Sequence, residues 1–362
     1  MKSRSLAALS VSVVFAISGI PAYAGEAEAD PFGKYEETLD VHFVRATDDT
    51  IETYALGNLP GQTLEDNFWL DTYRDELGIN VVYDWIVKGD DEYSQKINIT
   101  IATGELPDIM SVTATQMVQL AEADLIADIS DVYEAYAADF TKETLTQEGD
   151  DPFLAASIDG KMYGLPVTGG SVDSVDLMWI RQDWLDKFDL EIPQTMDELL
   201  TVIDKFTNED PDGDGENNTY GIGVAGSPNV FGGGYGGLKG FFNAYGAYPT
   251  IWVEKDGQLV YGATQPECKE ALATLADLYQ KGMIDPEFGV MDSGKAGEAG
   301  ASGKCGLTFG QQWLSLVQFQ TNYNLDNDAV WSACPIPTAG DEKASAQADL
   351  GTTRWLVVRK DF

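Results

Sequence analysis

The sequence predicts an α/β protein of two lobes, and three observations lead to this prediction. The chain has 362 residues, more than the roughly 100–200 residues of one domain. Strand-like and helical segments alternate along most of it, which is typical of sheets with crossover helices. A Gly/Ser/Thr-rich stretch interrupts this alternation once, near residues 164–175. A hydrophobic content of 44% is sufficient for a core in each lobe.

The first lobe is expected at residues 38–165. Its predicted elements are, in order, a strand at 38–46, a helix at 66–77, a strand at 79–87, a helix that ends near Gly104 and a short strand at 108–110. Apolar residues alternate in the strands and recur every three or four positions in the helices. Gly78 and Gly104 stand where a helix C-terminus favours glycine. This order predicts a parallel sheet.

The second lobe is expected at residues 166–337, and residues 338–362 are expected to return to the first lobe. The predicted elements are strands at 175–180, 220–225, 306–310, 330–336 and 351–358, and helices at 197–206 and 271–278. Thr195 and Glu198 have the spacing of a capping box that begins the first of these helices. Because the chain stops directly after a strand-like segment, we expect a protein truncated at its C-terminus.

Residues 1–24 have the pattern of a signal peptide. Lys2 and Arg4 precede an apolar stretch at 6–17, and Ala22-Tyr23-Ala24 supplies the small residues that signal peptidase requires. Residues 25–37 then form an acidic tether. No cysteine lies near the cleavage site, so no lipoprotein anchor is expected. The sequence predicts an exported protein that is periplasmic, extracellular or at the cell surface.

The charge and the rare reactive residues exclude several classes of function. The net charge of −38 repels nucleic-acid phosphates, so no nucleic acid is expected as a partner. The negative electrostatic potential of the protein favours an uncharged or cationic small molecule, or a divalent cation, as the ligand. One histidine, His42, and three widely spaced cysteines disfavour a Cys/His metal site, a disulfide scaffold and most Ser-His or Cys-His mechanisms.

Residues 210–221 (DPDGDGENNTYG) resemble the opening of an EF-hand calcium loop. Asp210, Asp212 and Asp214 occupy positions 1, 3 and 5, and the glycine at position 6 permits the sharp turn. Glu216 would contribute its carbonyl oxygen and Asn218 would stand at position 9. Position 12 is a glycine rather than the bidentate glutamate, so the last ligand is water or comes from elsewhere. The sequence predicts structural Ca²⁺; the alternative is a solvated acidic turn.

Residues 232–237 (GGGYGG) formally contain a GxGxxG pattern. A dinucleotide-binding fingerprint needs a strand directly before it, and Ser227-Pro228-Asn229 intervenes. We therefore expect a flexible loop.

Aromatic side chains at the ends of predicted strands are candidates for sugar binding. Sugar rings stack their C–H faces on aromatic rings, while their hydroxyls bond to carboxylates, amides and guanidinium groups. A cleft between two lobes is the expected place for such a site. The candidates are Trp69, Tyr163, Trp179, Tyr235, Tyr245 and Trp313.

Several segments together resemble the solute-binding proteins of bacterial carbohydrate ABC importers, of the maltose-binding-protein type. They are TGELPDI at 103–109, KMYGLP at 161–166, MWIRQDWL at 178–185, IPQTMDEL at 192–199, the 210–221 loop, GKCG at 303–306 and FGQQW at 309–313. They occur in family order and cover nearly the whole mature chain. The acidic loop resembles a Gram-positive subgroup with an internal calcium site.

The resemblance implies a type II periplasmic-binding-protein clamshell that closes on a mono- or oligosaccharide and delivers it to a membrane permease. It implies that Trp313 stacks on the sugar and that Trp179 and Arg181 lie at the cleft, with Tyr163 at the first crossover between lobes. We expect a monomer. The subgroup usually carries a lipoprotein cysteine, and here Gly25 follows the predicted cleavage site.

Two other functions stay open at this point. A secreted carbohydrate-active enzyme would need a carboxylate pair at a defined separation, and no pair stands out among the 60 acidic residues. A binding protein for a peptide or another non-sugar solute would use the same fold, with a charged residue for the peptide termini. The leading interpretation is a binding protein and not an enzyme.

Overall fold

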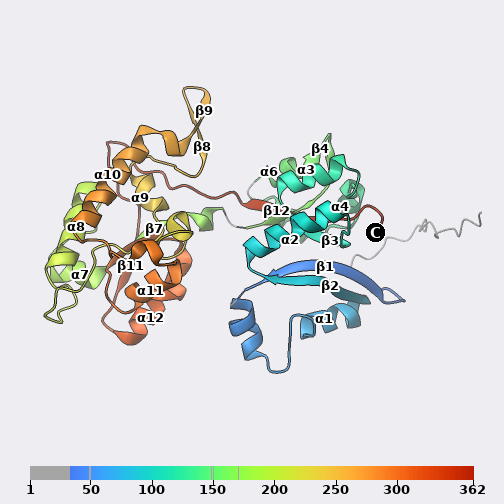
Figure 1. The fold of residues 1–362 in the computed structure, drawn as a ribbon, viewed down its shortest axis with the longest axis horizontal. Helices are drawn as coiled ribbons and strands as arrows, with labels where there is room; N and C mark the ends of the chain where they lie inside the picture. Colours follow the sequence, from blue (N-terminus) through green and yellow to red (C-terminus); the bar gives the residue numbers. More distant parts are fainter. Residues whose placement is uncertain (1–32, 49, 148, 150, 170) are drawn as a thin grey trace, which may run out of the picture. The chain divides into compact units, whose positions relative to one another are not determined.

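The computed structural model describes residues 33–362 except 49, 148, 150 and 170. The predicted signal peptide and most of the predicted tether lie outside these residues. The chain forms two compact units (Figure 1). Of the described residues, unit 1 comprises 33–165 and Leu356–Phe362, and unit 2 comprises Pro166–Trp355.

The larger sheet has the strand order β2-β1-β3-β12-β6, and the boundary between the two units falls within β6 and β12. The strands are β1 (Leu39–Thr47), β2 (Ile79–Lys88), β3 (Ile109–Val112), β6 (Leu165–Thr168) and β12 (Thr352–Val358). β1 runs parallel to β2 along its whole length and parallel to β3 at Phe43. The parallel arrangement predicted from the order of strands and helices is confirmed. Figure 1 shows helices α1 and α2 on opposite sides of the β1–β2 pair.

Two helical segments of unit 1 end at the predicted glycines, and the helices described between residues 114 and 156 were not predicted from the sequence. The helices of unit 1 are α1 (Phe68–Thr72), α2 (Asp90–Thr103), α3 (Ala114–Glu122), α4 (Ser130–Tyr136), α5 (Asp139–Leu145) and α6 (Asp151–Ala156), followed by the hairpin of β4 (Ser157–Ile158) and β5 (Lys161–Met162). Gly78 and Gly104 both adopt left-handed backbone, with φ of 68° and 74°, as C-terminal glycines do. The helix predicted at 66–77 continues past α1 as a π-helical turn, η3 (Tyr73–Leu77).

Unit 2 contains a smaller, antiparallel sheet. The central strand β7 (Leu177–Arg181) pairs with β10 (Leu307–Gly310) on one side and with β11 (Trp331–Cys334) on the other. Four of the five residues of β7 and all four of β10 are buried, because helices cover this sheet. The residues of its core include Met178, Ile180, Trp184, Phe206, Phe241 and Phe309.

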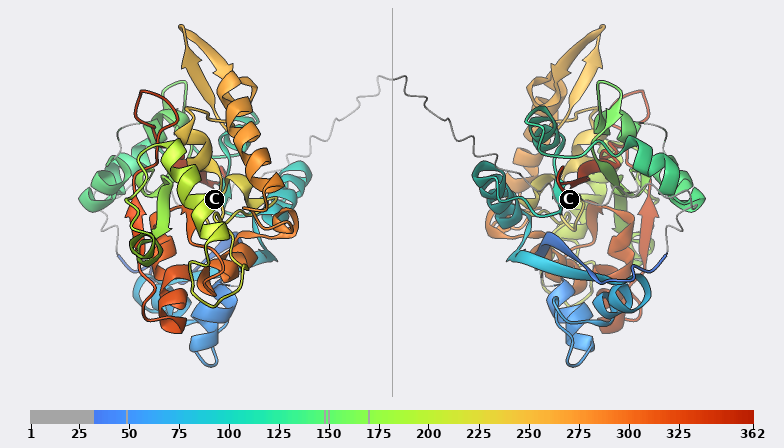
Figure 2. Two further views of the ribbon diagram at one scale, coloured as in Figure 1. Left: turned by 90° about the vertical axis from the view of Figure 1, so that its left-hand side faces the viewer. Right: turned by 90° about the vertical axis from the view of Figure 1, so that its right-hand side faces the viewer.

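The helices of unit 2 are α7 (Gln182–Lys187), α8 (Met196–Asn208), α9 (Lys239–Ala244), α10 (Pro266–Gln280), α11 (Ser293–Ala301) and α12 (Gln318–Leu325). The predicted capping box is present, since Thr195 accepts from the Glu198 amide and Glu198 accepts from the Thr195 amide. The hairpin of β8 (Trp252–Lys255) and β9 (Gln258–Tyr261) stands out from unit 2 in both directions of view (Figures 1 and 2).

The strand predicted at 220–225 is wrong. Tyr220 forms an isolated bridge with Cys305, and the following amides bond to separate partners, Gly223 to Leu307 and Ala225 to Gly236. Instead, the glycines of this segment allow it to pack closely against neighbouring parts of the chain. A Cβ on Gly221 would lie 2.2 Å from the Ile203 carbonyl oxygen, so this chain packs on helix α8 rather than pairing along one neighbouring strand.

Residues 338–355, predicted as part of the return to the first lobe, are bonded to unit 2. The Ala339 amide donates to Ala244, and the Gln347 amide donates to the buried side chain of Asn243 at 2.7 Å. Only the last part of the predicted return segment, Leu356–Phe362, belongs to unit 1. There Arg359 forms an ion pair with buried Asp108 at 2.7 Å.

Candidate functional site

The turn that follows strand β10 presents Trp313 from unit 2. Gly310 ends the strand, and Trp313 lies on the short 3-10 helix η8 (Gln312–Leu316). Its indole is half-buried, and its Nε1–H donates to Gln311 Oε1 at 2.9 Å. The second atom of the Gln311 amide, Nε2, donates to the Ser174 carbonyl oxygen at 3.0 Å. The indole is therefore fixed through its N–H while part of its ring stays accessible.

The glycine-rich run at 232–237 packs against this turn. Gly233 accepts a hydrogen bond from the Gln311 amide at 2.9 Å. A Cβ on Gly233 would lie 2.2 Å from the Gln311 side chain, and one on Gly234 would lie 3.8 Å from the Trp313 ring. The run is the loop expected from the sequence, and no described strand directly precedes it. Its glycines allow a close approach to the residues that carry Trp313.

Trp179 and Arg181 lie on β7 and are buried. The Trp179 indole donates to the Gly310 carbonyl oxygen at 3.2 Å, and its ring lies 4.9 Å from that of Phe319. Arg181 is 3% exposed and forms ion pairs with Asp183 at 2.5 Å and Asp326 at 3.2 Å. These contacts occupy the indole N–H of Trp179 and the guanidinium group of Arg181.

The two tyrosines predicted in unit 2 are also held by their own lobe. Tyr235 has no exposed surface, and burial raises the pKa of its hydroxyl well above the ordinary value. Tyr245 is half-buried and its hydroxyl bonds to Thr274 Oγ1 at 2.8 Å. Trp313, Trp179 and Tyr235 nevertheless belong to one aromatic cluster, together with Phe319 and Trp331.

The two candidates in unit 1 differ in exposure. Trp69 on α1 is 61% exposed and contacts the ring of Phe68, with 5.1 Å between ring centroids. Tyr163 is half-buried, and its amide donates to Ala156. Each has ring surface that a ligand could contact.

A cavity of about 510 Å³ lies in unit 1 where β1 and β2 end. Its lining includes Thr47 and Lys88, the last residues of the two strands, with Glu52 and Gln62 from the segment after β1. Lys88 Nζ lies 3.5 Å from Glu52 Oε2. The buried Thr47 hydroxyl has no hydrogen-bond partner among the described residues. Carboxyl ends of parallel strands are a usual ligand position, and this cavity offers donors and acceptors there.

The acidic loop between α8 and Tyr220 brings three carboxylates together. One oxygen from each of Asp210, Asp212 and Asp214 lies within 4.8 Å of the others. Burial raises the pKa of Asp212; the hydrogen bond with Asp210 and the charge of Asp214 add to the rise, although the backbone hydrogen bond from Asp214 lowers it. The Gly215 amide donates to Asp210 Oδ2 at 3.2 Å, which closes the turn at position 6.

Two buried oxygens in this loop fit a cation. Asp210 Oδ1 and Asn218 Oδ1 have no hydrogen-bond partner among the residues that the structure describes. They stand at positions 1 and 9 of the predicted calcium loop. Unsatisfied buried oxygens carry a free-energy cost, and a hard cation that prefers oxygen ligands would remove that cost.

Sequence reasoning did not find Gln311 or Trp331 as parts of the site. Gln311 was visible in FGQQW, but its role depends on Ser174, which lies 137 residues earlier in the chain. Trp331 stacks on Phe319 with 4.2 Å between centroids, and its indole donates to Asn322 at 2.8 Å. No spacing in the sequence indicates either contact.

Residues 60–361 match the family described as bacterial extracellular solute-binding protein. The chain belongs to this family. It is 28% identical over 261 residues to the lipoprotein LipO of Bacillus subtilis (strain 168), covering 72% of this chain and 49% of LipO. It is 29% identical over 231 residues to the fructooligosaccharide ABC transporter substrate-binding protein FusA of Streptococcus pneumoniae serotype 4, covering 60% of this chain and 41% of FusA. This solute-binding protein thus spans about half the length of the curated relatives that it matches.

Solved structures show the same fold. FusA in complex with kestose has a TM-score of 0.66 and 22% identity, covering 89% of this chain and 63% of FusA. An HMO-binding solute-binding protein from Bifidobacterium longum infantis has a TM-score of 0.68 and 20% identity, covering 90% of this chain and 64% of that chain. The fold is that of the type II periplasmic binding proteins, as predicted. Within the described residues, no helix has the length and apolar character of a membrane span.

Proposed function

We propose that this solute-binding protein captures an oligosaccharide for an ABC importer. The observation that carries the proposal is the Trp313 indole, half-buried and held by Gln311 at the end of β10. Two relatives support the substrate class: FusA is a fructooligosaccharide ABC transporter substrate-binding protein, and YtcQ of Bacillus subtilis is a polygalacturonan/rhamnogalacturonan-binding protein. A permease is the corresponding partner, and we propose that the protein is a monomer.

The charge of the chain selects among sugars. At a net charge of −38, the protein repels an anionic ligand at long range. A neutral oligosaccharide meets no such barrier, and its C–H faces match the exposed part of the indole. We therefore propose a neutral sugar rather than a uronate polymer.

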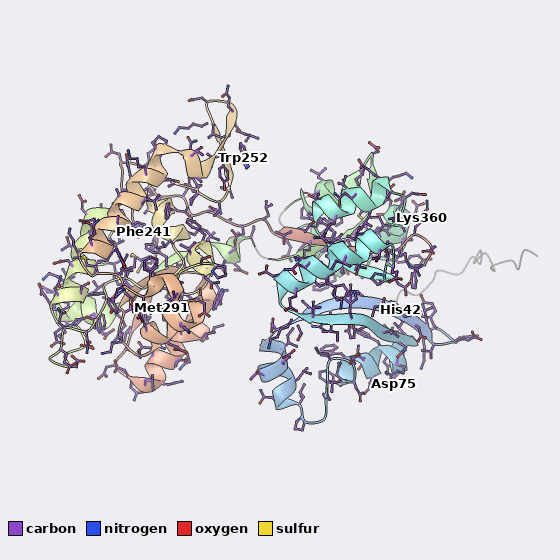
Figure 3. The ribbon with its side chains drawn as sticks, in the orientation of Figure 1. His42, Asp75, Phe241, Trp252, Met291 and Lys360 are labelled. Carbon is purple, nitrogen blue, oxygen red and sulfur yellow. The ribbon has the colours of Figure 1, made fainter. Side chains whose placement is uncertain are left out.

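The test is a titration with defined ligands, in which binding is measured by calorimetry and by tryptophan fluorescence. The panel is kestose, a neutral milk oligosaccharide, an oligogalacturonate and a short peptide. Trp313→Ala should weaken the best ligand at least about thirtyfold, the size of a dominant contact. The matched control is Trp252→Ala, because Trp252 is 64% exposed on the β8 strand of the same unit (Figure 3).

Equal losses of ligand affinity in Trp313→Ala and Trp252→Ala would contradict the assignment of Trp313 as the sugar-stacking residue. Preferential binding of the peptide would instead favour the alternative function, that of a binding protein for a peptide or another non-sugar solute.

We propose reversible capture rather than catalysis. The family and the structural neighbours are solute-binding proteins. Sugar recovered intact after long incubation with the protein would agree with this. Release of shorter sugars would establish the carbohydrate-active enzyme in its place.

We propose that the 210–221 loop binds a structural Ca²⁺ through Asp210, Asp212, Asp214 and Asn218 side chains and the Glu216 carbonyl. The orphaned oxygens of Asp210 and Asn218 support this, and a FusA structure with fructo-nystose is that of an EF-hand mutant. When bound, the ion would neutralise the converging carboxylates and join α8 to the segment at Tyr220. A midpoint of thermal unfolding that does not change with chelator would contradict the proposal.

We propose that the protein is exported and that residues 1–24 are removed. Mass spectrometry of the secreted protein should give an N-terminus at Gly25. An N-terminal peptide that retains Met1 would contradict this.

A further inference from the structure

The amide side chain of Gln311 connects the proposed sugar-stacking residue to a distant part of unit 2. Its Oε1 accepts from the Trp313 indole at 2.9 Å, and its Nε2 donates to the Ser174 carbonyl oxygen at 3.0 Å. An indole N–H can only donate and a carbonyl oxygen can only accept. A primary amide satisfies both, so the orientation of the Gln311 side chain is determined by its two partners.

Ser174 lies on the segment by which the chain enters unit 2, residues 171–176. Its hydroxyl accepts a hydrogen bond from the Asp349 amide at 2.7 Å. Asp349 lies on the segment by which the chain leaves unit 2, residues 338–355. Near the same ends, the Gly169 amide donates to the Gly351 carbonyl oxygen at 2.6 Å. The entering and leaving segments are thus bonded to each other, and Gln311 bonds to the entering one.

An ion pair between buried Lys239 of helix α9 and exposed Asp349 holds the leaving segment against this helix. Lys239 is 3% exposed, and its Nζ lies 2.9 and 3.0 Å from the two carboxylate oxygens of Asp349. Because Lys239 is buried while the Asp349 side chain is 48% exposed, the cost of separating the pair lies in leaving the lysine charge buried without a partner. Asp349 therefore bonds to Lys239 through its side chain and to Ser174 through its backbone amide.

We propose that Gln311 is a positioning residue that couples the Trp313 indole to the entering and leaving segments of unit 2. The coupling rests on the proposed function, in which Trp313 contacts the sugar. Sugar bound against the indole restricts its ring and thereby the amide of Gln311. The restricted amide stabilises Ser174 and, through its hydroxyl, Asp349.

Substitution of Gln311 with glutamate removes one of its two side-chain hydrogen bonds and keeps the other. In Gln311→Glu, the carboxylate still accepts from the Trp313 indole but has no donor for the Ser174 carbonyl oxygen. Gln311→Met removes both hydrogen bonds at similar volume. Gln312→Glu is the matched control, because it makes the same chemical change at the next, exposed residue of η8.

The measurement is amide hydrogen exchange at Asp349 and Gly169 in the full chain, with and without saturating sugar. Without sugar, both amides should exchange about three- to tenfold faster in Gln311→Glu than in the wild type, the size expected for one lost hydrogen bond. Sugar should slow both amides in the wild type and in Gln312→Glu. It should not slow them in Gln311→Glu, although sugar still binds.

Equal exchange in Gln311→Glu and the wild type would overturn the coupling, whether or not sugar binds. Failure of every sugar to bind the wild type would overturn the proposed function, and the sugar-free comparison would still decide the role of Gln311. Trp313→Phe provides a second route if Gln311→Glu does not fold, because it removes the indole donor and keeps an aromatic ring. Unchanged exchange in Trp313→Phe would also overturn the coupling.

Discussion

Asp176 makes the stability of unit 2 depend on pH. It precedes strand β7, is 1% exposed, and accepts a hydrogen bond from the Gly240 amide at 2.9 Å through Oδ2. Its Oδ1 has no partner among the described residues. Burial raises its pKa from the ordinary 3.8 to about 6, even though the hydrogen bond from Gly240 and the charge of Lys239 lower it; the charge of Asp349 raises it further.

The size of the effect follows from the two pKa values. One pKa unit corresponds to about 1.4 kcal/mol, so the rise from 3.8 to about 6 disfavours the ionised folded state by about 3 kcal/mol. Between these pH values, the folded state keeps a proton that the unfolded state has lost. The contribution of Asp176 to stability is therefore greatest below pH 3.8 and is lost as the pH rises from there through about 6.

Asp176→Asn removes this titration and keeps an acceptor for the Gly240 amide. Urea unfolding of the wild type and the variant should be compared at about pH 4, 6 and 8, because groups shared by both proteins then cancel. The unfolding free energy of the variant relative to the wild type should rise by about 2.4 kcal/mol from the lowest to the highest pH, because the unfolded aspartate is already partly ionised at the lowest. The unpaired amide nitrogen of the asparagine adds a constant cost, which does not change this difference.

The control is Asp173→Asn, because Asp173 lies three residues earlier and is exposed. It should leave the pH dependence as in the wild type. A difference between Asp176→Asn and the wild type that stays constant from pH 4 to 8 would refute the reasoning, since it would mean that Asp176 titrates alike in the folded and unfolded states.

Three further predictions concern stability. Thr195→Ala removes the side-chain cap of α8 and should lower the unfolding free energy by about 1 kcal/mol in urea titrations; no change would show that the cap is not needed. Phe206→Ala empties a fully buried position that contacts Trp184 edge to face and should cost about 3–5 kcal/mol, whereas Phe140→Ala, at a residue 77% exposed, should cost under about 0.5 kcal/mol. Calcium at about a hundredfold excess over its dissociation constant should add about 2.7 kcal/mol, and Asp212→Asn should remove most of that gain; an equal gain in the variant would place the ion elsewhere.

Features that depend on a few neighbouring residues were predictable from the sequence. Gly78 and Gly104 end their helices in left-handed backbone, because only local backbone geometry decides that preference. The capping box at Thr195 is equally local. The spacing of the three aspartates brings their oxygens within 4.8 Å, since a tight loop leaves little other choice.

The exposure of aromatic residues was not predictable in the same way. Trp179, Tyr235 and Trp313 all looked suitable for contact with a sugar, yet only Trp313 of these three keeps a partly exposed ring. Burial depends on which distant segments pack against a ring. For Tyr235 these include Gly223 and Gly300, where any side chain would collide with it.

The sequence by itself determined the α/β class, the helix ends at Gly78 and Gly104, the start of α8 and the acidic loop of this solute-binding protein, because short-range periodicity, caps and turn chemistry act between residues close in the chain. Tertiary structure alone decided that Trp313 stays accessible while Trp179 is buried, and that Gln311 bonds to Ser174 across 137 positions of sequence. Those outcomes depend on packing and hydrogen bonds between segments far apart in the chain, and local sequence preferences do not encode them.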